Sequence, residues 1–245
     1  MTRDAEKTLL HSCPGNKGSR IERMFDSIAG NYDTLNHTLS MGIDKGWRKK
    51  GLSTLKKLNP KSILDVATGT GDLAIQACGV LNPDSILGID ISEGMMEIAR
   101  QKALKAGLSD VITFERQDCM ALELEDNSFD AVTVAYGVRN FEDLNKGLKE
   151  IFRVLKPEGQ LMILELTTPQ HFPMKQGYRI YSKLIIPSIG RLVSKDKTAY
   201  SYLPRSIEAF IQGKQMTNAL LANGFRDASY KTYTFGLCTM YLASK

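Results

Sequence analysis

The sequence predicts an α/β fold with a doubly wound, mostly parallel sheet that is closed by an antiparallel hairpin. Three observations predict it. Short apolar runs alternate with segments of helical periodicity between residues 63 and 166. The first run, 63–66, passes through a glycine turn directly into a helix, and the chain ends on two apolar runs near 227–234 and 236–243. Strands joined by helices of this length pair in parallel through right-handed crossovers, and two adjacent terminal runs form a hairpin.

The N-terminal part of the chain precedes the first strand. Residues 1–18 contain proline and glycine, which is typical of a loose tail. Apolar residues recur at helical spacing over 19–30, and a second helix with a basic face runs to about Leu58, where Asn59-Pro60 ends it. Residues 1–59 are therefore expected to form a tail and a helical lid on the ligand edge of the sheet.

The core, residues 60–168, alternates strands and helices within what is expected to be a single domain over 1–245. Ser92 is a good N-cap and Gly107 a good stop for the helix between them. After a basic interruption at 169–205, Ser206 is expected to cap a last helix, so that 206–245 supplies the closing helix and hairpin. The expected strands are 63–66, 85–90, 111–116, 129–135 and 160–166, and the expected helices are 70–80, 93–106, 142–155 and 206–222.

The turn Gly69-Thr70-Gly71 after the first strand is the predicted ligand site. Its glycines let the backbone approach a ligand, and the helix start offers N–H groups. Residues 69–74 fit the dinucleotide pattern G-x-G-x-x-A, but Asp65 at the strand end and Asp72 in the turn would repel a pyrophosphate. S-adenosylmethionine fits better, since its ammonium and sulfonium suit this acidity and its carboxylate would use turn amides. A tight turn with solvated carboxylates is the alternative.

Acidic residues also end the next strands. Asp90, followed by Ile91, stands where an acid reaches a ribose diol in nucleotide-binding α/β folds, with an acid at a helix N-terminus as the alternative. NAD and S-adenosylmethionine both contain ribose, so Asp90 does not decide between them. Asp118 with Cys119 is placed to meet an adenine amine and ring nitrogen, against a solvated strand-end acid. Ala135 ends the fourth strand, beneath the expected methionine part.

Composition excludes several classes of protein. With 42% hydrophobic and 24% charged residues the chain is ordinarily globular. Its apolar runs fall short of the roughly 20 residues of a membrane span, and its first residues lack a signal-peptide core, so a cytoplasmic protein is expected. The scattered cysteines, Cys13, Cys78, Cys119 and Cys238, are expected to be free thiols, and three histidines make a metal centre unexpected.

The net charge of +5 is concentrated in residues 171–205, where basic residues and tyrosines intermingle. Tyr178, Tyr181, Leu184 and Ile185 fall on one helical face. This face suits equally a helix that lies peripherally in an anionic membrane interface and a lid over a substrate. Nucleic acid also suits basic patches with tyrosines, but no separate RNA-binding motif is present, so no nucleic-acid partner is expected. A homodimer is compatible with the sequence.

Three longer stretches resemble a known family. The first stretch is residues 32–40 (YDTLNHTLS) with Trp47-Arg48, the second is residues 136–140 (YGVRN), and the third is residues 153–161 (RVLKPEGQL) through Glu165-Leu166-Thr167. All three are similar to motifs of the ubiquinone/menaquinone biosynthesis C-methyltransferases. These are class I methyltransferases with a Rossmann-like fold, and the match covers about residues 20–245. Asp44 departs from a frequent His, and Ala135 from a frequent Ser, which removes one hydroxyl near the cofactor.

The resemblance implies C-methylation of a reduced polyprenyl quinone by S-adenosylmethionine, with demethylmenaquinol favoured over 2-methoxy-6-polyprenyl-1,4-benzoquinol. Another lipid or small-molecule methyltransferase is the nearest alternative. A dinucleotide-dependent oxidoreductase and a non-catalytic binding protein are alternatives from other classes. By resemblance, the residues that bind or shape the cofactor site are Gly69, Thr70, Gly71, Asp90, Asp118 and Cys119.

Arg139 and Asn140 follow the fourth strand, at the edge where a substrate would face the methyl group. Arg139 keeps its proton in proteins, so it is expected to stabilise an oxyanion or to orient a water that accepts the proton. Pairing with Glu142 or Asp143 is the alternative. His37 is either a base or a capping or core histidine. The residues expected around the substrate are Tyr32, Asn36, Tyr136 and Tyr178.

Overall fold

The apolar runs form one seven-stranded sheet. Its strands are β1 (Ser62–Val66), β2 (Ser85–Asp90), β3 (Ile112–Arg116), β4 (Phe129–Ala135), β5 (Leu155–Leu166), β6 (Asp227–Tyr233) and β7 (Cys238–Ser244), in the order β3-β2-β1-β4-β5-β7-β6. The computed structural model describes residues 17–182 and 197–245. Strands β1 to β5 pair in parallel, whereas β7 is antiparallel to both β5 and β6. The predicted α/β class and the closing hairpin are therefore confirmed.

Alternate residues of the strands pack against helices on opposite faces. Ile63 faces a core that contains Trp47 of α3 (Ile43–Leu52) and Leu73 of α4 (Asp72–Leu81). Leu64 faces the other core, with Leu148 of α6 (Leu144–Val154) and Leu220 of α10 (Lys214–Ala222). Helix α5 (Glu93–Lys105) packs on β2 and β3, and Ser92 caps it as predicted by accepting from Met95 N–H at 3.2 Å.

Helix α2 (Lys17–Leu39) is longer than predicted. Helical spacing predicts that this helix ends near residue 30, but the helix continues through 31–39. Gly30 costs about 1 kcal/mol in a helix, and packing outweighs that cost because α2 is held between α5 and α9 (Lys197–Ala209). Met24, Ile28, Met95 and Tyr202 form this contact. The 3₁₀ helix η1 (Ser53–Lys57) then follows α3, and the predicted loose tail up to residue 16 lies outside the described residues.

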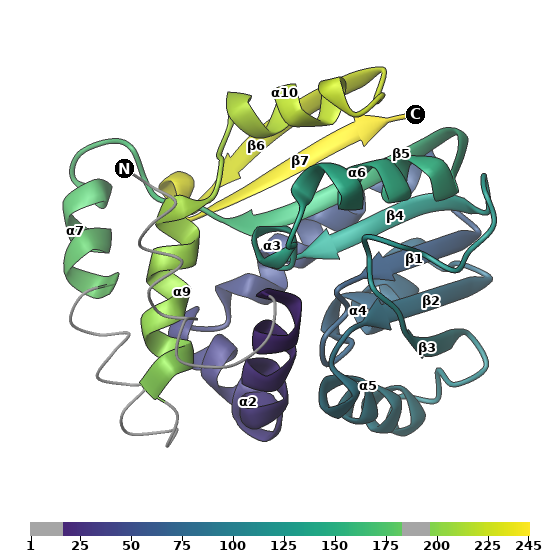
Figure 1. Cartoon of the computed structure of the whole chain (residues 1–245), viewed down its shortest axis with the longest axis horizontal. Coiled ribbons are helices and arrows are strands. Elements are labelled where there is room, and N and C mark those ends of the chain that lie inside the picture. The colour runs from purple at the N-terminus through teal and green to yellow at the C-terminus, as the bar shows by residue number, and fades with distance from the viewer. Residues whose placement is uncertain (1–16, 183–196) are drawn as a thin grey trace.

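The single helix predicted over 206–222 is wrong. The chain instead forms α9 and α10, separated around Gly213, whose φ of 56° and ψ of −123° leave the helical region. Ser206 lies inside α9 and donates to Leu203 O at 2.9 Å rather than capping a helix. Figure 1 shows α2, α7 (Met174–Ile180) and α9 gathered at the edge where the parallel strands end.

Two class predictions concern the described part of the chain. Cys78, Cys119 and Cys238 are free thiols there, as expected, while Cys13 lies outside the described residues. In residues 17–182 and 197–245, every helix is too short or too polar to cross a bilayer.

Candidate active site

Two neighbouring cavities open at the carboxyl ends of the parallel strands. The large cavity has a volume of about 310 Å³ and is enclosed by residues of α2, α3 and α7. The small cavity has a volume of about 100 Å³ and lies beside the ends of β2 and β4. The border between the cavities is formed by five residues that line both of them: Tyr32, Ala67, Gly69, Ala135 and Tyr136. The two cavities are therefore neighbours that share part of their lining.

The turn between β1 and α4 requires glycine at two positions. Gly69 has a φ of 56° and Gly71 a φ of 78°, a region that favours glycine. A Cβ on Gly71 would also lie 3.0 Å from the Ala99 Cβ. Gly69 N–H donates to Asp90 Oδ2 at 2.9 Å, and Gly71 N–H donates to Thr68 O at 3.0 Å. The protein uses these two amides to hold the turn, and the prediction that turn amides receive a ligand carboxylate stays a prediction.

Asp65 lines the large cavity from the end of β1 and is only 1% exposed. It accepts hydrogen bonds from Thr68 Oγ1 at 2.6 Å and from Thr133 Oγ1 at 2.7 Å. Burial raises the pKa of Asp65 to about 6, although the two hydroxyl groups oppose the rise. A cation beside Asp65 would supply the stabilisation that the ionised carboxylate lacks here, which is the environment predicted for an ammonium group.

The small cavity fits a nucleoside. Asp90 accepts from the backbone N–H groups of Gly69 and Ser92, each at 2.9 Å, and burial raises its pKa. Carboxylate oxygens carry further lone pairs, so two ribose hydroxyls can still donate to Asp90. That these residues bind the cofactor stays a prediction. The predicted cofactor residues that line this cavity are Gly69, Asp90, Ile91, Asp118, Cys119 and Ala135, of which Ala135 was expected beneath the methionine part.

Arg139 lies in the 3₁₀ helix η2 (Val138–Asn140), lines the large cavity and is 6% exposed. Its Nη1 is 2.6 Å from Glu165 Oε1 and also donates to Tyr136 O. Burial lowers the pKa of Arg139, but Glu165 and the hydroxyl groups of Tyr32 and Tyr202 raise it more. The predicted alternative, pairing with Glu142 or Asp143, is wrong, because a buried guanidinium takes the buried carboxylate that faces it.

Asn140 does not share the cavity of Arg139. It lines the small cavity, and its Oδ1 accepts a hydrogen bond from Tyr202 Oη at 2.9 Å. Arg139 and Asn140 were predicted to lie together at the edge where the substrate faces the methyl group, but they line different cavities. Arg139 faces the large cavity, whereas Asn140 links the cofactor edge to α9.

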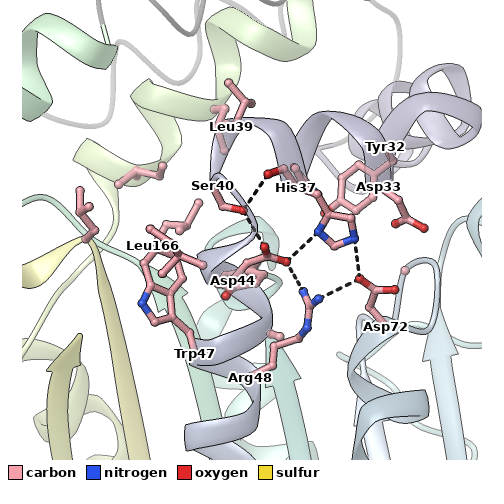
Figure 2. A pocket seen from close by; sticks show the side chains of 18 of the residues that line it. Tyr32, Asp33, His37, Leu39, Ser40, Asp44, Trp47, Arg48, Asp72 and Leu166 are labelled. Carbon is pink, nitrogen blue, oxygen red and sulfur yellow. Dashed lines mark hydrogen bonds and ion pairs between the residues drawn. The ribbon is translucent and has the colours of Figure 1, made fainter. Parts of the chain in front are cut away.

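Figure 2 shows a ring of four polar side chains, His37, Asp44, Arg48 and Asp72, on the wall of the large cavity. His37 Nδ1 lies 3.0 Å from Asp44 Oδ2, and His37 Nε2 lies 3.4 Å from Asp72 Oδ2. Arg48 bridges the same two carboxylates at 2.9 Å each. Both ring nitrogens of His37 face carboxylates, which favours holding α2 to α3 and α4 over acting as a base. The Arg48 guanidinium supplies the positive charge that these acids require.

Asp72 does not carry the unpaired negative charge that the sequence analysis assumes. Lys102 of α5 forms an ion pair with it, in addition to Arg48. Burial raises the pKa of Asp72, but Lys102, Arg48 and His37 together lower it below its ordinary value. Asp72 is therefore not expected to repel a pyrophosphate, contrary to the prediction. Asp65 lines the large cavity, and Asp90 and Asp118 line the small one, without an ion-pair partner among the described residues.

Thr70 connects the glycine turn to the lid. Its Oγ1 donates to Asp33 Oδ1 at 2.5 Å, and Lys102 Nζ lies 2.8 Å from Asp33 Oδ2. Thr70 lines the large cavity rather than the small one. The Thr70 hydroxyl group thus positions α2 over the turn, and the assignment of Thr70 to cofactor binding stays a prediction.

Helix α7 turns its tyrosines towards the protein. Tyr178 is 9% exposed and lines the large cavity, where its hydroxyl group has no hydrogen-bond partner among the described residues. Tyr181 Oη donates to Leu39 O at 2.6 Å. For these two residues the structure favours the lid over the membrane-facing helix. Leu184 and Ile185 lie outside the described residues, and Tyr32 and Asn36 line the large cavity from α2.

The sequence analysis assigns no role to three charged residues that shape the site: Glu165, Arg48 and Lys102. The sequence around Glu165 indicated a paired acid, since Glu165 is a single acid within the apolar run at the end of β5. Such an acid is rarely buried without a partner. Arg48 stands inside one of the recognised stretches. Lys102 gave no such signal, because a lysine on a helix ordinarily indicates a solvated face.

The chain is similar to known proteins over nearly its whole length. Residues 14–245 match the model of the ubiE/COQ5 methyltransferase family. A demethylmenaquinone methyltransferase of Bacteroides fragilis is 56% identical over 240 residues, 98% of each chain. A ubiquinone/menaquinone biosynthesis C-methyltransferase of Geobacter sulfurreducens is 40% identical and covers 94% of this chain and 90% of its own. A SAM-dependent methyltransferase structure from Aquifex aeolicus has a TM-score of 0.55 at 19% identity, over 75% of this chain and 81% of its own.

Proposed function

Because this chain belongs to the ubiE/COQ5 methyltransferase family, we propose that it methylates a ring carbon of demethylmenaquinol to give menaquinol. It is a methyltransferase that uses S-adenosylmethionine, as the recognised motifs predict. The family decides against the dinucleotide oxidoreductase that the glycine pattern alone left open. Relatives that are 56%, 45% and 42% identical carry the name demethylmenaquinone methyltransferase, which supports the naphthoquinol over the benzoquinol.

One observation carries the substrate class. The large cavity is lined by apolar side chains, including Leu39, Trp47 and Leu166. Within it, Arg139 Nε and Tyr178 Oη are buried without a hydrogen-bond partner among the described residues. Buried polar atoms ordinarily have partners, so these two mark where polar atoms of a ligand belong. A quinol fits, since it carries two oxygens on an otherwise apolar ring and tail.

The chemistry follows from what these residues hold. When bound, S-adenosylmethionine supplies an electrophilic methyl group on a sulfonium. A ring carbon becomes nucleophilic when the hydroxyl beside it loses its proton, and Arg139 would stabilise the resulting phenolate in a site of low dielectric. Arg139 remains protonated, so a water or another group takes the hydroxyl proton. The proton on the methylated ring carbon leaves afterwards, which restores the aromatic ring. Helices α2 and α7 exclude solvent over the border between the cavities, where alignment contributes much of the rate.

The test is a methylation assay under reducing, anaerobic conditions. Demethylmenaquinol and 2-methoxy-6-polyprenyl-1,4-benzoquinol are offered separately with trideuteromethyl S-adenosylmethionine, and products are analysed by mass spectrometry before and after oxidation. We expect a labelled naphthoquinol that still oxidises to a quinone, because the methyl group is on carbon. A labelled ether that resists oxidation, or label on the benzoquinol alone, would refute the proposed substrate.

We also propose that the mouth of the large cavity contacts the membrane surface peripherally. Met41, Phe172 and Ile180 are 79%, 81% and 60% exposed, and Lys175 and Arg179 are exposed on α7. Exposed apolar side chains beside basic ones suit an anionic interface, and a polyprenyl tail resides in lipid. Co-sedimentation with phosphatidylglycerol vesicles tests this. The double substitution Phe172→Asp and Ile180→Asp is expected to release the protein, and unchanged binding would contradict the proposal.

A further inference from the structure

Glu165 is buried as deeply as Asp65, beside the wall of the large cavity. It lies one residue before the end of β5 and is 1% exposed. Its carboxylate contacts Arg139 at two points, because Oε1 lies 2.6 Å from Nη1 and Oε2 accepts the Arg139 backbone N–H at 3.3 Å. Oε1 also accepts Leu166 N–H at 2.8 Å. Glu165 itself does not line either cavity.

These contacts restrict Arg139 to one orientation. Nη1 is shared between Glu165 and the carbonyl of Tyr136, so this corner of the guanidinium faces away from a ligand. Nε has no partner among the described residues. A planar guanidinium that is fixed at one corner presents its remaining donors in a defined direction.

The charge of Glu165 is as important as its shape. A buried guanidinium without a partner is strongly unfavourable, and the neighbouring phenols of Tyr32 and Tyr202 are neutral at physiological pH. Glu165 is the acid that contacts Arg139 in the described part of the chain. The pair is therefore neutral overall before any substrate oxygen ionises beside it.

We propose that Glu165 is a positioning residue for methyl transfer, which orients the Arg139 guanidinium and sets the charge that the ionising quinol hydroxyl meets. The inference rests on the proposed function. Removing the charge of Glu165 leaves Arg139 with one more unit of positive charge relative to the pair, so a bound phenolate becomes easier to form. The same change loosens the guanidinium, so alignment and turnover fall. A purely structural role for Glu165 predicts the second effect without the first.

The experiment compares Glu165→Gln with wild type and with Glu158→Gln. Glu158 is a matched control, since it lies in the same strand but is exposed and pairs with Arg226 at 2.8 Å. For each protein, kcat is measured from pH 6 to 10 with demethylmenaquinol under anaerobic conditions, and the Kd of S-adenosylhomocysteine is measured by calorimetry. The pH dependence of kcat reports groups that ionise in the enzyme–substrate complex.

We expect Glu165→Gln to lower the maximal kcat about 10- to 100-fold and to move the rising limb of the profile to lower pH by about one unit. The Kd of S-adenosylhomocysteine is expected to stay within about twofold of the wild-type value, and Glu158→Gln to behave as wild type. A rising limb that stays in place, or a wild-type kcat, in Glu165→Gln would overturn the proposal.

A second variant covers the case in which Glu165→Gln does not fold. Glu165→Asp keeps the charge but is one methylene shorter. We therefore expect the rising limb of its pH profile at the wild-type pH and a kcat lowered at least about tenfold. Full wild-type turnover in this variant would contradict the inference. An inactive wild-type protein would instead refute the proposed function, which separates the two failures.

Discussion

Binding of the cofactor should weaken as the pH falls through 6, because Asp65 is the acid predicted to meet its ammonium group. The structure holds this carboxyl at 1% exposure with two hydroxyl donors, and burial raises its pKa to about 6. A cation favours the ionised form, so the ligand must hold Asp65 deprotonated. At pH 7 about nine in ten of these carboxyls are already ionised, and at pH 5 about one in ten.

The expected result is a Kd for S-adenosylhomocysteine about tenfold higher at pH 5 than at pH 7. Calorimetry in buffers of different ionisation enthalpy should also show release of close to one proton at pH 5. Acid unfolding through Asp65 is not a competing cause. A carboxyl whose pKa is raised in the folded state stabilises the fold at low pH and loses that contribution as the pH rises from about 4 through about 6.

Two variants make the test specific. Asp65→Asn should flatten the dependence between pH 5 and 7 and bind weakly at both. Asp130→Asn is the matched control, because Lys156 and the backbone N–H groups of Lys61 and Ser62 lower the pKa of that carboxyl to about 2 against the effect of its burial. The reasoning is refuted if wild-type affinity is the same at both pH values, or if Asp65→Asn keeps the tenfold change.

Three further substitutions test other parts of the site. Gly71→Ala should lower the free energy of unfolding by about 1 to 2 kcal/mol in urea titrations, because the φ of Gly71 is 78°. Gly79→Ala is the control and should not lower it, because a Cβ at this position in α4 meets open space. Equal effects of the two substitutions would contradict this prediction. Arg48→Met should cost about 3 kcal/mol by removing the partner of two acids, against a much smaller loss for Arg226→Met at an exposed pair. A small loss at Arg48 would refute the ring's role. Arg139→Met should lower turnover at least about 100-fold and leave the Kd of S-adenosylhomocysteine nearly unchanged, and equal loss of both would contradict its assignment to the large cavity.

Local signals predicted most of the sheet. Strand β4 matches the prediction over 129–135, and the capping hydroxyl of Ser92 accepts the expected N–H. These features depend on residues near one another in sequence, such as alternating burial and the chemistry of a cap. The terminal acid Asp90 and Asp118, which follows β3, meet at one cavity because parallel strands deliver their carboxyl ends to the same edge.

Pairing between distant charges was decided only by the tertiary structure. The alternative reading of Arg139 paired it with an acid three or four residues away, but its partner Glu165 is 26 residues away on β5. Asp72 looked like a free acid until α5 brought Lys102 to it and α3 brought Arg48. Helix periodicity likewise placed Tyr178 on an apolar face without stating which surface that face meets.

Local sequence was enough to predict the order of the strands, the glycine turn and the family to which the chain belongs, because each depends on neighbouring residues or on long motifs. The tertiary structure alone decided which charges neutralise one another and which side chains reach each cavity. The physical reason is that a charge or a hydroxyl acts on whatever lies within a few ångströms, and the fold chooses those neighbours from anywhere along the chain.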